Sequence, residues 1–339
     1  MNILVTGGAG FIGSHTCIEL IKEGFNIIVA DNLCNSSRES LNRVEYISKS
    51  SVEFFEIDIR NKEGLSKIFD SCNISGVIHF AGLKSVNESL LYPEKYHSYN
   101  VLGSKNLLEV MSAYKCKNII FSSSASVYGD PKYVPIDEKS SLNPTNPYGK
   151  TKLTIENILS DKHKSDRSWK IVALRYFNPV GAHVSGLIGE DPNGVPDNLM
   201  PLILRVASNQ SQSLEIFGGD YNTKDGTGIR DYIHVVDLAK AHVSALRKIL
   251  NSGSSCLTIN LGTGYGVSVL DLIKTFESVT GKKVPYKIAS RRDGDTEISY
   301  ADPSLAYELF NWKAAKNLEE MCEDAWRWHC KNPNGYEET

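Results

Sequence analysis

Apolar residues in the first half of the chain form short runs that alternate with longer segments of helical periodicity. The runs are rich in β-branched and aromatic residues and lie at 3–6, 26–30, 52–57, 76–80, 118–122 and 171–176. Helical patterns lie between several of them, after Gly13 and at residues 94–114 and 150–163. Such alternation is typical of a parallel sheet that is covered by helices on both faces. We therefore expect an α/β protein with a doubly wound parallel sheet.

The pattern changes after Phe177. Residues 178–198 are rich in glycine and proline, which predicts a long irregular segment of the kind that often carries function. Shorter strands and helices follow, and a helix at 237–248 and a strand at 257–261 could return to the first sheet. We expect one domain at 1–177, to which 235–262 return, and a smaller mixed α/β domain at 178–339.

A glycine-rich loop follows the first predicted strand and contains Gly7, Gly10 and Gly13. Glycines at such positions let the backbone turn tightly and approach a pyrophosphate at the N-terminus of the next helix. Asp31 follows the second predicted strand, where a carboxylate accepts hydrogen bonds from the adenosine ribose and repels a 2′-phosphate. The loop and Asp31 together predict a Rossmann-type domain that binds NAD rather than NADP.

Tyr148 and Lys152 are four residues apart in a predicted helix and therefore share one face of it. The pKa of a phenol is ordinarily near 10, and a neighbouring ammonium together with a positive nicotinamide should lower it. Ser124, at the end of the fifth predicted strand, can relay or orient a substrate proton. Without the glycine loop, Tyr148 would be read as a half-buried core residue. With the loop, we expect a catalytic group of Tyr148, Lys152 and Ser124.

Composition narrows the class of protein. The 339 residues are 41% hydrophobic and 23% charged, which is typical of a soluble globular chain, and the net charge of -3 argues against a nucleic-acid partner. We find no apolar run of membrane-spanning length. The first strand begins at once, so we expect no secretory leader and a cytoplasmic location. The seven cysteines are scattered, and Cys322, His329 and Cys330 match no common metal site, so we expect reduced thiols and no metal.

The chain resembles the extended short-chain dehydrogenase/reductase family, and most closely its nucleotide-sugar 4-epimerases. The segments that carry the resemblance run in order along the chain, at 5–15, 31–35, 79–84, 122–129, 175–182, 226–234 and 291–295. The resemblance implies that NAD stays bound while UDP-glucose and UDP-galactose interconvert through a transient 4-keto sugar. It also implies a homodimer, which we expect to form through the helices at 94–114 and 150–163.

Motifs and resemblance together place two sets of binding residues. The expected cofactor contacts are Gly7, Gly10, Phe11, Ile12, Gly13, Asp31, Asn32, Leu33, Cys34, Asn35, Ser36, Asp58, Ile59, Phe80, Ala81, Gly82, Leu83, Lys84, Asn100, Ser122, Tyr148, Lys152 and Phe177. The expected UDP-sugar contacts are Lys84, Ser124, Tyr148, Asn178, Asn198, Leu199, Glu215, Ile216, Phe217, Arg230, Arg292, Asp295 and Ser299. Arginine is suited to a pyrophosphate because its guanidinium donates in a fork.

One position bears on the range of sugars. Family members that reject N-acetylated sugars tend to carry a tyrosine where this chain has Ser299, and a smaller residue leaves space for an acetamido group. The resemblance therefore implies that UDP-GlcNAc and UDP-GalNAc are also interconverted.

Two other classes of function compete with epimerisation. A related 4,6-dehydratase or decarboxylase carries acidic residues just before the Val-Tyr-Gly motif, where this chain has Ala125 and Ser126. A non-catalytic NAD-sensing protein of the same fold would commonly lack Tyr148 or Lys152, and both are present.

Overall fold

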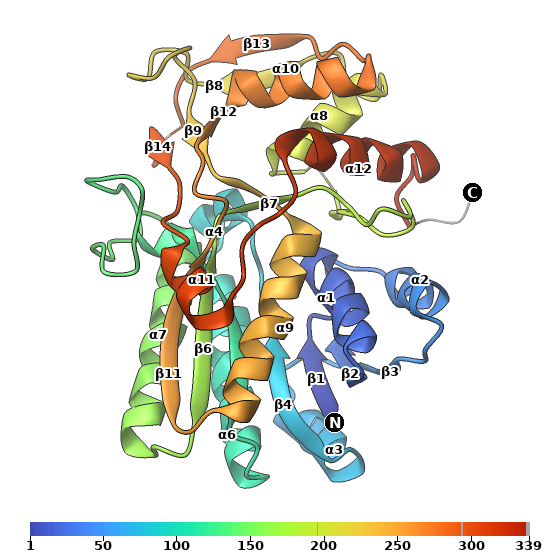
Figure 1. The fold of residues 1–339 in the computed structure, drawn as a ribbon, viewed down its shortest axis with the longest axis vertical. Helices are drawn as coiled ribbons and strands as arrows, with labels where there is room; N and C mark the ends of the chain where they lie inside the picture. Colours follow the sequence, from blue (N-terminus) through green and yellow to red (C-terminus); the bar gives the residue numbers. More distant parts are fainter. Residues whose placement is uncertain (195, 293, 337–339) are drawn as a thin grey trace.

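Seven parallel strands form the largest sheet in the computed structural model, which describes residues 1–194, 196–292 and 294–336 (Figure 1). Asp293 of the 291–295 motif and the end of the predicted second domain lie outside the described residues. The strand order is β11-β6-β5-β4-β1-β2-β3. The order reverses at β1, as expected for a doubly wound sheet, and the predicted Rossmann-type α/β fold is confirmed.

The strands of this sheet form where the apolar runs were predicted. They are β1 Asn2–Thr6, β2 Asn26–Asp31, β3 Glu53–Glu56, β4 Ile74–His79, β5 Asn118–Ser124, β6 Lys170–Tyr176 and β11 Ser255–Leu261. The bounds of the first six agree with prediction to within two residues. Ile3, Leu4 and Val5 are fully buried in succession, because helices cover both faces of the sheet.

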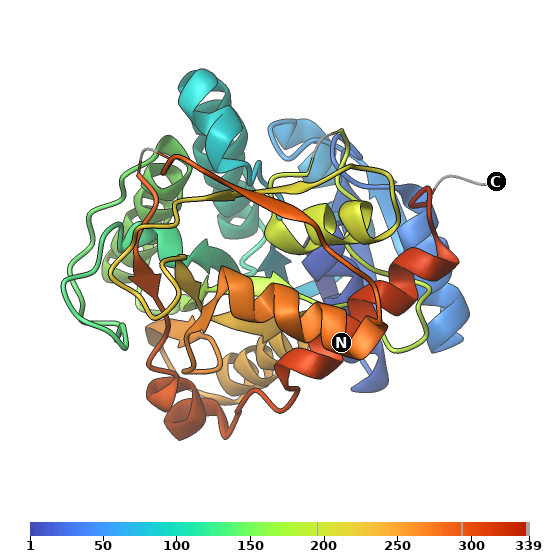
Figure 2. The same ribbon diagram turned by 90° about the horizontal axis from the view of Figure 1, so that it is seen from above.

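The two faces are covered by different helices (Figure 2). One hydrophobic core lies under α1 Phe11–Lys22, α2 Arg38–Ser48 and α9 Val235–Asn251. The other lies under α3 Lys62–Ser71, α6 Gly103–Ala113 and α7 Pro147–Ser165. The sheet is therefore the middle layer of three, and only the ends of its strands remain for a ligand.

Helix α7 begins three residues earlier than the predicted start at residue 150. Its N-cap is Asn146, whose side chain accepts a hydrogen bond from the Gly149 N–H at 2.8 Å, and Pro147 occupies the first helical position. Both residue types favour the start of a helix. The earlier start places Tyr148 in the first turn of α7.

The predicted helix at 94–114 is not uniform. It consists of α5 Pro93–Tyr96, a π-helical turn at His97–Leu102, and α6, and it is preceded by a short helix, α4 Val86–Leu91. A 3₁₀ turn at Ala125–Val127 separates β5 from the segment that leads to α7. The π-helical turn widens the helix and carries Asn100.

Most of the remaining elements lie beyond the carboxyl ends of the parallel strands, outside the three layers, and we call them the second layer (Figure 1). They are β7 Asn178–Val180, α8 Leu199–Ala207, β8 Leu214–Phe217, β9 Ile229–Arg230, β10 Tyr232–His234, β12 Val267–Ser268, α10 Val269–Thr280, β13 Tyr286–Ala289, β14 Ile298–Ser299 and α12 Leu318–Lys331. Among the described residues they build three small sheets, ordered β10-β7, β12-β9-β14 and β13-β8. Their apolar residues form a separate core around Ile203, Leu272 and Phe276. Helix α11 Ser304–Phe310 packs instead against α9 and β11 of the large sheet.

Two strand pairings bear on the predicted boundaries. Strand β11 pairs in parallel with β6, so residues 255–261 belong to the large sheet, as their pattern allowed. Strand β7 pairs with β10 in a separate sheet, so the predicted irregular segment begins with a short strand. The pattern missed β7 because its partner comes much later in the chain. The division into domains at residue 177 stays a prediction. Within the described part of the chain, no helix combines the length and apolar character that crossing a membrane requires.

Candidate active site

A cavity of about 1030 Å³ lies at the carboxyl ends of the parallel strands. The turns after β1, β2, β4, β5 and β6 line one side of it, and the second layer lines the other. Open α/β sheets bind their ligands at this edge. Of the residues predicted to contact cofactor or substrate, all but Leu33 and Asn100 line this cavity.

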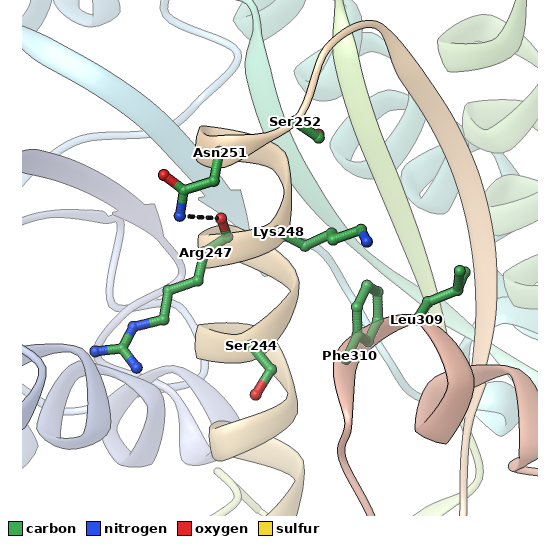
Figure 3. A pocket seen from close by; sticks show the side chains of 7 residues that line it. All are labelled: Ser244, Arg247, Lys248, Asn251, Ser252, Leu309 and Phe310. Carbon is green, nitrogen blue, oxygen red and sulfur yellow. Dashed lines mark hydrogen bonds between the residues drawn. The ribbon is translucent and has the colours of Figure 1, made fainter.

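Another cavity, of about 450 Å³, lies between α9 and α11 (Figure 3). It is lined by Ser244, Arg247, Lys248, Asn251, Ser252, Leu309 and Phe310. Arg247 is paired with Glu23, and its carbonyl accepts a hydrogen bond from Asn251. This cavity lies away from the predicted catalytic group, so we take the larger cavity as the candidate active site.

The glycine loop forms a cradle in which side chains would not fit. Gly7 has a φ of 72°, and a Cβ added there would lie 2.6 Å from the Ala81 nitrogen. A Cβ on Gly13 would lie 2.3 Å from the Gly7 carbonyl oxygen. Gly10 caps α1 without a side chain, which leaves the N–H groups of the first turn for a ligand. These features match what a pyrophosphate requires at a helix N-terminus.

Asp31 ends β2 beside this cradle. Its Oδ2 accepts a hydrogen bond from the Ala9 N–H at 3.1 Å, and its Oδ1 accepts from the Leu33 N–H and the Ser36 hydroxyl, both at 2.9 Å. Burial raises the pKa of the carboxyl, and these hydrogen bonds act in the opposite direction. Leu33 has a φ of 55° and packs on the core, so it supports Asp31 through its backbone instead of lining the cavity.

Asn100 does not line the cavity but supports the loop that follows β4 through hydrogen bonds to its backbone. Its Oδ1 accepts a hydrogen bond from the Leu83 N–H at 2.7 Å, and its Nδ2 donates to the Leu83 carbonyl and to the Thr151 hydroxyl, both at 3.1 Å. His79 ends β4 between the Thr6 and Ser104 hydroxyls, at 2.7 and 2.8 Å. Burial lowers the pKa of His79 to about 3, so the imidazole is neutral and serves to hold this edge of the cavity.

The predicted catalytic residues converge from two elements. Tyr148 and Lys152 come from the first two turns of α7, and Ser124 comes from the end of β5. The Lys152 Nζ lies 5.7 Å from the centroid of the Tyr148 ring and donates a hydrogen bond to the Ser122 carbonyl at 2.7 Å. All four residues line the larger cavity.

Burial shifts the protonation of this group. The pKa of Tyr148 is raised by burial, and a hydrogen bond with Ser124 acts against the shift. Burial also lowers the pKa of Lys152 to about 8, while the negative charge of Glu156 opposes that change. The predicted lowering of the Tyr148 pKa included the charge of a bound nicotinamide and stays a prediction. In the protein chain itself, burial acts in the opposite direction.

Apart from Lys84, Ser124 and Tyr148, the predicted substrate residues come from β7, α8, β8, β9, β14 and the loops beside them. Arg230 on β9 lies in register with Ser299 on β14. The Arg292 guanidinium stacks over the Phe217 ring at 4.6 Å and pairs with Asp295 at 3.0 Å. Arg230 and Arg292, which carry fork-shaped donors, thus both line the cavity.

Sequence reasoning missed several polar residues that line the cavity, among them Glu190 and Tyr221. The Glu190 Oε1 accepts hydrogen bonds from Lys84 at 2.7 Å and from Asn198 at 2.6 Å, and so joins a predicted cofactor contact to a predicted substrate contact. Tyr221 lies under the guanidinium of Arg291 at 4.1 Å. Both residues lie in segments without periodicity. Only the acidic character of Glu190 within a glycine-rich segment could have drawn attention to it.

Comparisons with known proteins agree with this geometry. The sequence model of the family described as GDP-mannose 4,6 dehydratase matches residues 4–325. The UDP-glucose 4-epimerase of Bacillus subtilis (strain 168) is 55% identical over 336 residues, which cover 99% of each chain. The crystal structure of UDP-glucose 4-epimerase from Bifidobacterium longum in complex with NAD+ and UDP superposes with a TM-score of 0.96 at 49% identity, covering 99% of this chain and 100% of that one.

A third relative bears on the choice of sugar. The structure of the UDP-Glc/GlcNAc 4-epimerase from Campylobacter jejuni superposes with a TM-score of 0.85 at 34% identity, covering 97% of this chain and 99% of that one.

The fold, the strand-end cavity and the match over residues 4–325 show that the chain belongs to the extended short-chain dehydrogenases/reductases that act on nucleotide sugars. Within that class it belongs to the UDP-glucose 4-epimerase family, with which it shares about half of its residues over its full length. The dehydratase activity in the description of the family model calls for an acid before Val127, where this chain has Ala125 and Ser126.

Proposed function

We propose that this protein is an NAD-dependent isomerase that interconverts UDP-glucose and UDP-galactose. The observation that carries the proposal is that Tyr148, Lys152 and Ser124 line the same cavity as the glycine cradle. The glycine cradle and Asp31 would hold NAD, which would supply the hydride acceptor and donor for C4 of the sugar. The residues of the chain transfer one proton, and they bind the cofactor and the UDP group of the substrate.

Tyr148 carries the proton. Its phenol oxygen, oriented by Ser124, removes the proton of the sugar 4-hydroxyl and returns it after the 4-keto sugar has turned over. Lys152 lies on the same face of α7, and the Ser122 carbonyl holds its ammonium at 2.7 Å. A positive charge at this point stabilises the phenolate that forms, and it can also hold the nicotinamide ribose.

The substrate residues hold the UDP group and leave the hexose free to turn. Arg230 and Arg292 present guanidinium groups to the cavity, and guanidinium forks match the oxygens of a pyrophosphate. Asn198 and Leu199 at the start of α8, and Phe217 at the end of β8, border the same space. Binding that is strong at the nucleotide and weak at the sugar lets either face of C4 meet the cofactor.

Conversion of UDP-galactose by the wild-type protein and by Tyr148→Phe tests the proposal. The variant should lose about 10²- to 10⁴-fold in kcat, the usual contribution of a general acid/base, and should retain its NAD. Ser165→Ala, at the other end of α7, is the matched control and should keep full activity. An NAD-sensing protein would convert no sugar in any form, and a dehydratase would release a product that has lost one water. An unchanged rate in Tyr148→Phe would remove the tyrosine from the mechanism.

We also propose that UDP-GlcNAc and UDP-GalNAc are substrates. Ser299 lines the cavity on β14 beside Arg230, and its small side chain leaves about the volume of a phenol ring compared with tyrosine. A relative with 34% identity is described as acting on both UDP-Glc and UDP-GlcNAc. Ser299→Tyr should remove turnover of UDP-GlcNAc and leave turnover of UDP-glucose, whereas Ser299→Ala should keep both. Absence of UDP-GlcNAc turnover in the wild type would contradict this assignment.

We further propose that two copies of the chain associate through the segments at 94–114 and 150–163. Leu102 and Tyr114, both in the first segment, expose 43% and 37% of their surfaces, and a second copy of the chain would cover this apolar area. Sedimentation velocity should show a dimer for the wild type and a weaker one for Leu102→Glu. A monomeric wild type would refute the proposal.

A further inference from the structure

Three residues between β7 and α8, Glu190, Asn193 and Asp197, connect their segment to the chain that borders the cofactor side of the cavity. Asn193 makes two of these contacts with the loop after β2. Its backbone N–H donates to the Asn35 Oδ1, and its Nδ2 donates to the Cys34 carbonyl, both at 3.1 Å. Asn35 and Cys34 follow Asp31, which we expect to bind the adenosine ribose. One end of the connection therefore lies on the ribose-binding loop.

The other contacts reach the loop after β4 and the start of α4, which follows it. Asp197 accepts a hydrogen bond from the Ser85 hydroxyl and another from the Asn87 Nδ2 at 3.1 Å. Glu190 pairs with Lys84 of the same loop. All of these side chains line the larger cavity. The contacts therefore span the space between the two loops that enclose a dinucleotide on this edge of the sheet.

The segment is anchored behind these contacts. The Trp328 Nε1 donates to the Glu190 carbonyl at 3.3 Å, and the Tyr336 hydroxyl accepts from the Gly189 N–H at 3.2 Å. Trp328 and Tyr336 are buried, so this end is fixed to α12 and the turn after it. Figure 1 shows the yellow-green chain after β7 passing close to α12. Gly194, by contrast, has a φ of 78°, and a Cβ added there would have no described heavy atom within 4 Å.

We propose that Asn193 and Asp197 form a latch that governs how fast the dinucleotide leaves the protein. The inference rests on the proposed function, because it takes the ligand at this edge to be NAD. The latch is held at one end by buried residues and at the other by polar contacts near the surface. Such contacts can break singly without unfolding the core. The dinucleotide leaves when they open, and it is retained through many turnovers while they are closed.

The negative charge of Asp197 and its hydrogen bonds have opposite expected effects on the rate at which the dinucleotide is released. Asp197 carries a negative charge at the edge of a cavity that holds a diphosphate. Through charge alone, its removal would slow the release of the dinucleotide. Through loss of the latch, its removal would speed release, by about threefold to tenfold for a typical net hydrogen-bond contribution. The two effects act in opposite directions.

The experiment measures exchange of bound NAD for added etheno-NAD, followed by fluorescence, in the full-length protein. The variants are Asn193→Ala, Asp197→Ala, Asn87→Ala and the double variant Asp197→Ala with Asn87→Ala. Lys62→Ala is the control, since it removes an equally polar contact, with Glu109 at 2.6 Å, that lies outside the cavity. Each latch variant should exchange about threefold to tenfold faster than the wild type, and the control should match the wild type.

The double variant tests whether the contact itself is responsible. Asp197 and Asn87 share one hydrogen bond, so their combined effect should be smaller than the product of the single effects. Far-UV circular dichroism and the melting temperature verify folding, and Asn87→Ala removes the contact without a change of charge. Exchange rates within about twofold of wild type in Asn193→Ala and Asn87→Ala would overturn the latch. If the wild type takes up no dinucleotide, the proposed function fails as well.

Discussion

The buried ion pair behind the catalytic group offers a sharp test of how the site is supported. Glu156 follows Lys152 by one turn of α7, and its side chain is 8% exposed. It accepts hydrogen bonds from the Arg175 Nη2 at 2.6 Å and Nε at 2.9 Å, and from the Ser123 hydroxyl at 2.5 Å. The Arg175 side chain is 4% exposed and also donates to the Tyr128 hydroxyl at 2.9 Å. The change Glu156→Gln keeps the shape of the side chain and removes its charge.

The expected cost follows from the burial of the pair. Removing one partner of a buried ion pair leaves the other charge uncompensated, which typically costs about 3–5 kcal/mol. Glutamine retains one acceptor oxygen, so we expect the free energy of unfolding to fall by about 3 kcal/mol. This is a large share of the free energy of unfolding of a typical protein, about 5–15 kcal/mol. The charge of Glu156 also opposes the effect of burial on Lys152, so the pKa of Lys152 should fall below its present value of about 8.

Urea denaturation followed by circular dichroism, at one fixed NAD concentration, measures the loss. Glu109→Gln is the matched control, because the Lys62–Glu109 pair has a similar length but side chains that are 54% and 55% exposed. An exposed pair should lose less than about 1 kcal/mol. Replacing Glu156 by Leu together with Arg175 by Met removes both charges and should recover part of the loss. A Glu156→Gln variant that is no less stable than Glu109→Gln would refute the argument.

Three further predictions concern the cofactor and pH. Gly13→Ala should weaken NAD binding by more than about tenfold, since the added Cβ would lie 2.3 Å from the Gly7 carbonyl oxygen, and equilibrium dialysis measures this. Asp31→Ser removes a charge that repels a 2′-phosphate, so NADP should compete with NAD better than in the wild type; unchanged competition would contradict the role of Asp31. Because burial lowers the pKa of Lys152 to about 8, its ammonium is lost as pH rises through that value, and kcat should fall there. A kcat that stays constant from pH 7 to about pH 10 would contradict this.

The sheet was predictable because the rules that form it act over short distances. Runs such as residues 3–6 and 171–176 show β propensity within a few residues, and helical segments of ten residues or more separate them. The start of α7 was also available from Asn146 and Pro147, which are typical of an N-cap and a first helical position, although the prediction began at residue 150. Strand β7 was out of reach, since it exists through pairing with the distant β10.

The candidate site divides in the same way. The spacing of Gly7, Gly13 and Asp31 was enough to predict a dinucleotide site. The turn after β1 and the end of β2 are placed by local geometry alone. The roles of Asn100 and Glu190 depend on partners far along the chain, Leu83 and Thr151 for the first and Lys84 for the second.

By itself, the sequence determined the type of fold and pointed to the dinucleotide cradle and to the residues that we propose as acid/base, since each depends on residue type within a short window. Only the tertiary structure decided the electrostatics of the group and its surroundings. It turned the Lys152 ammonium to the Ser122 carbonyl and raised the pKa of Tyr148 through burial. It also brought Asn193 and Asp197 across to the loops after β2 and β4. Desolvation and contact between distant segments are properties of the packed chain, and they arise only when the layers meet.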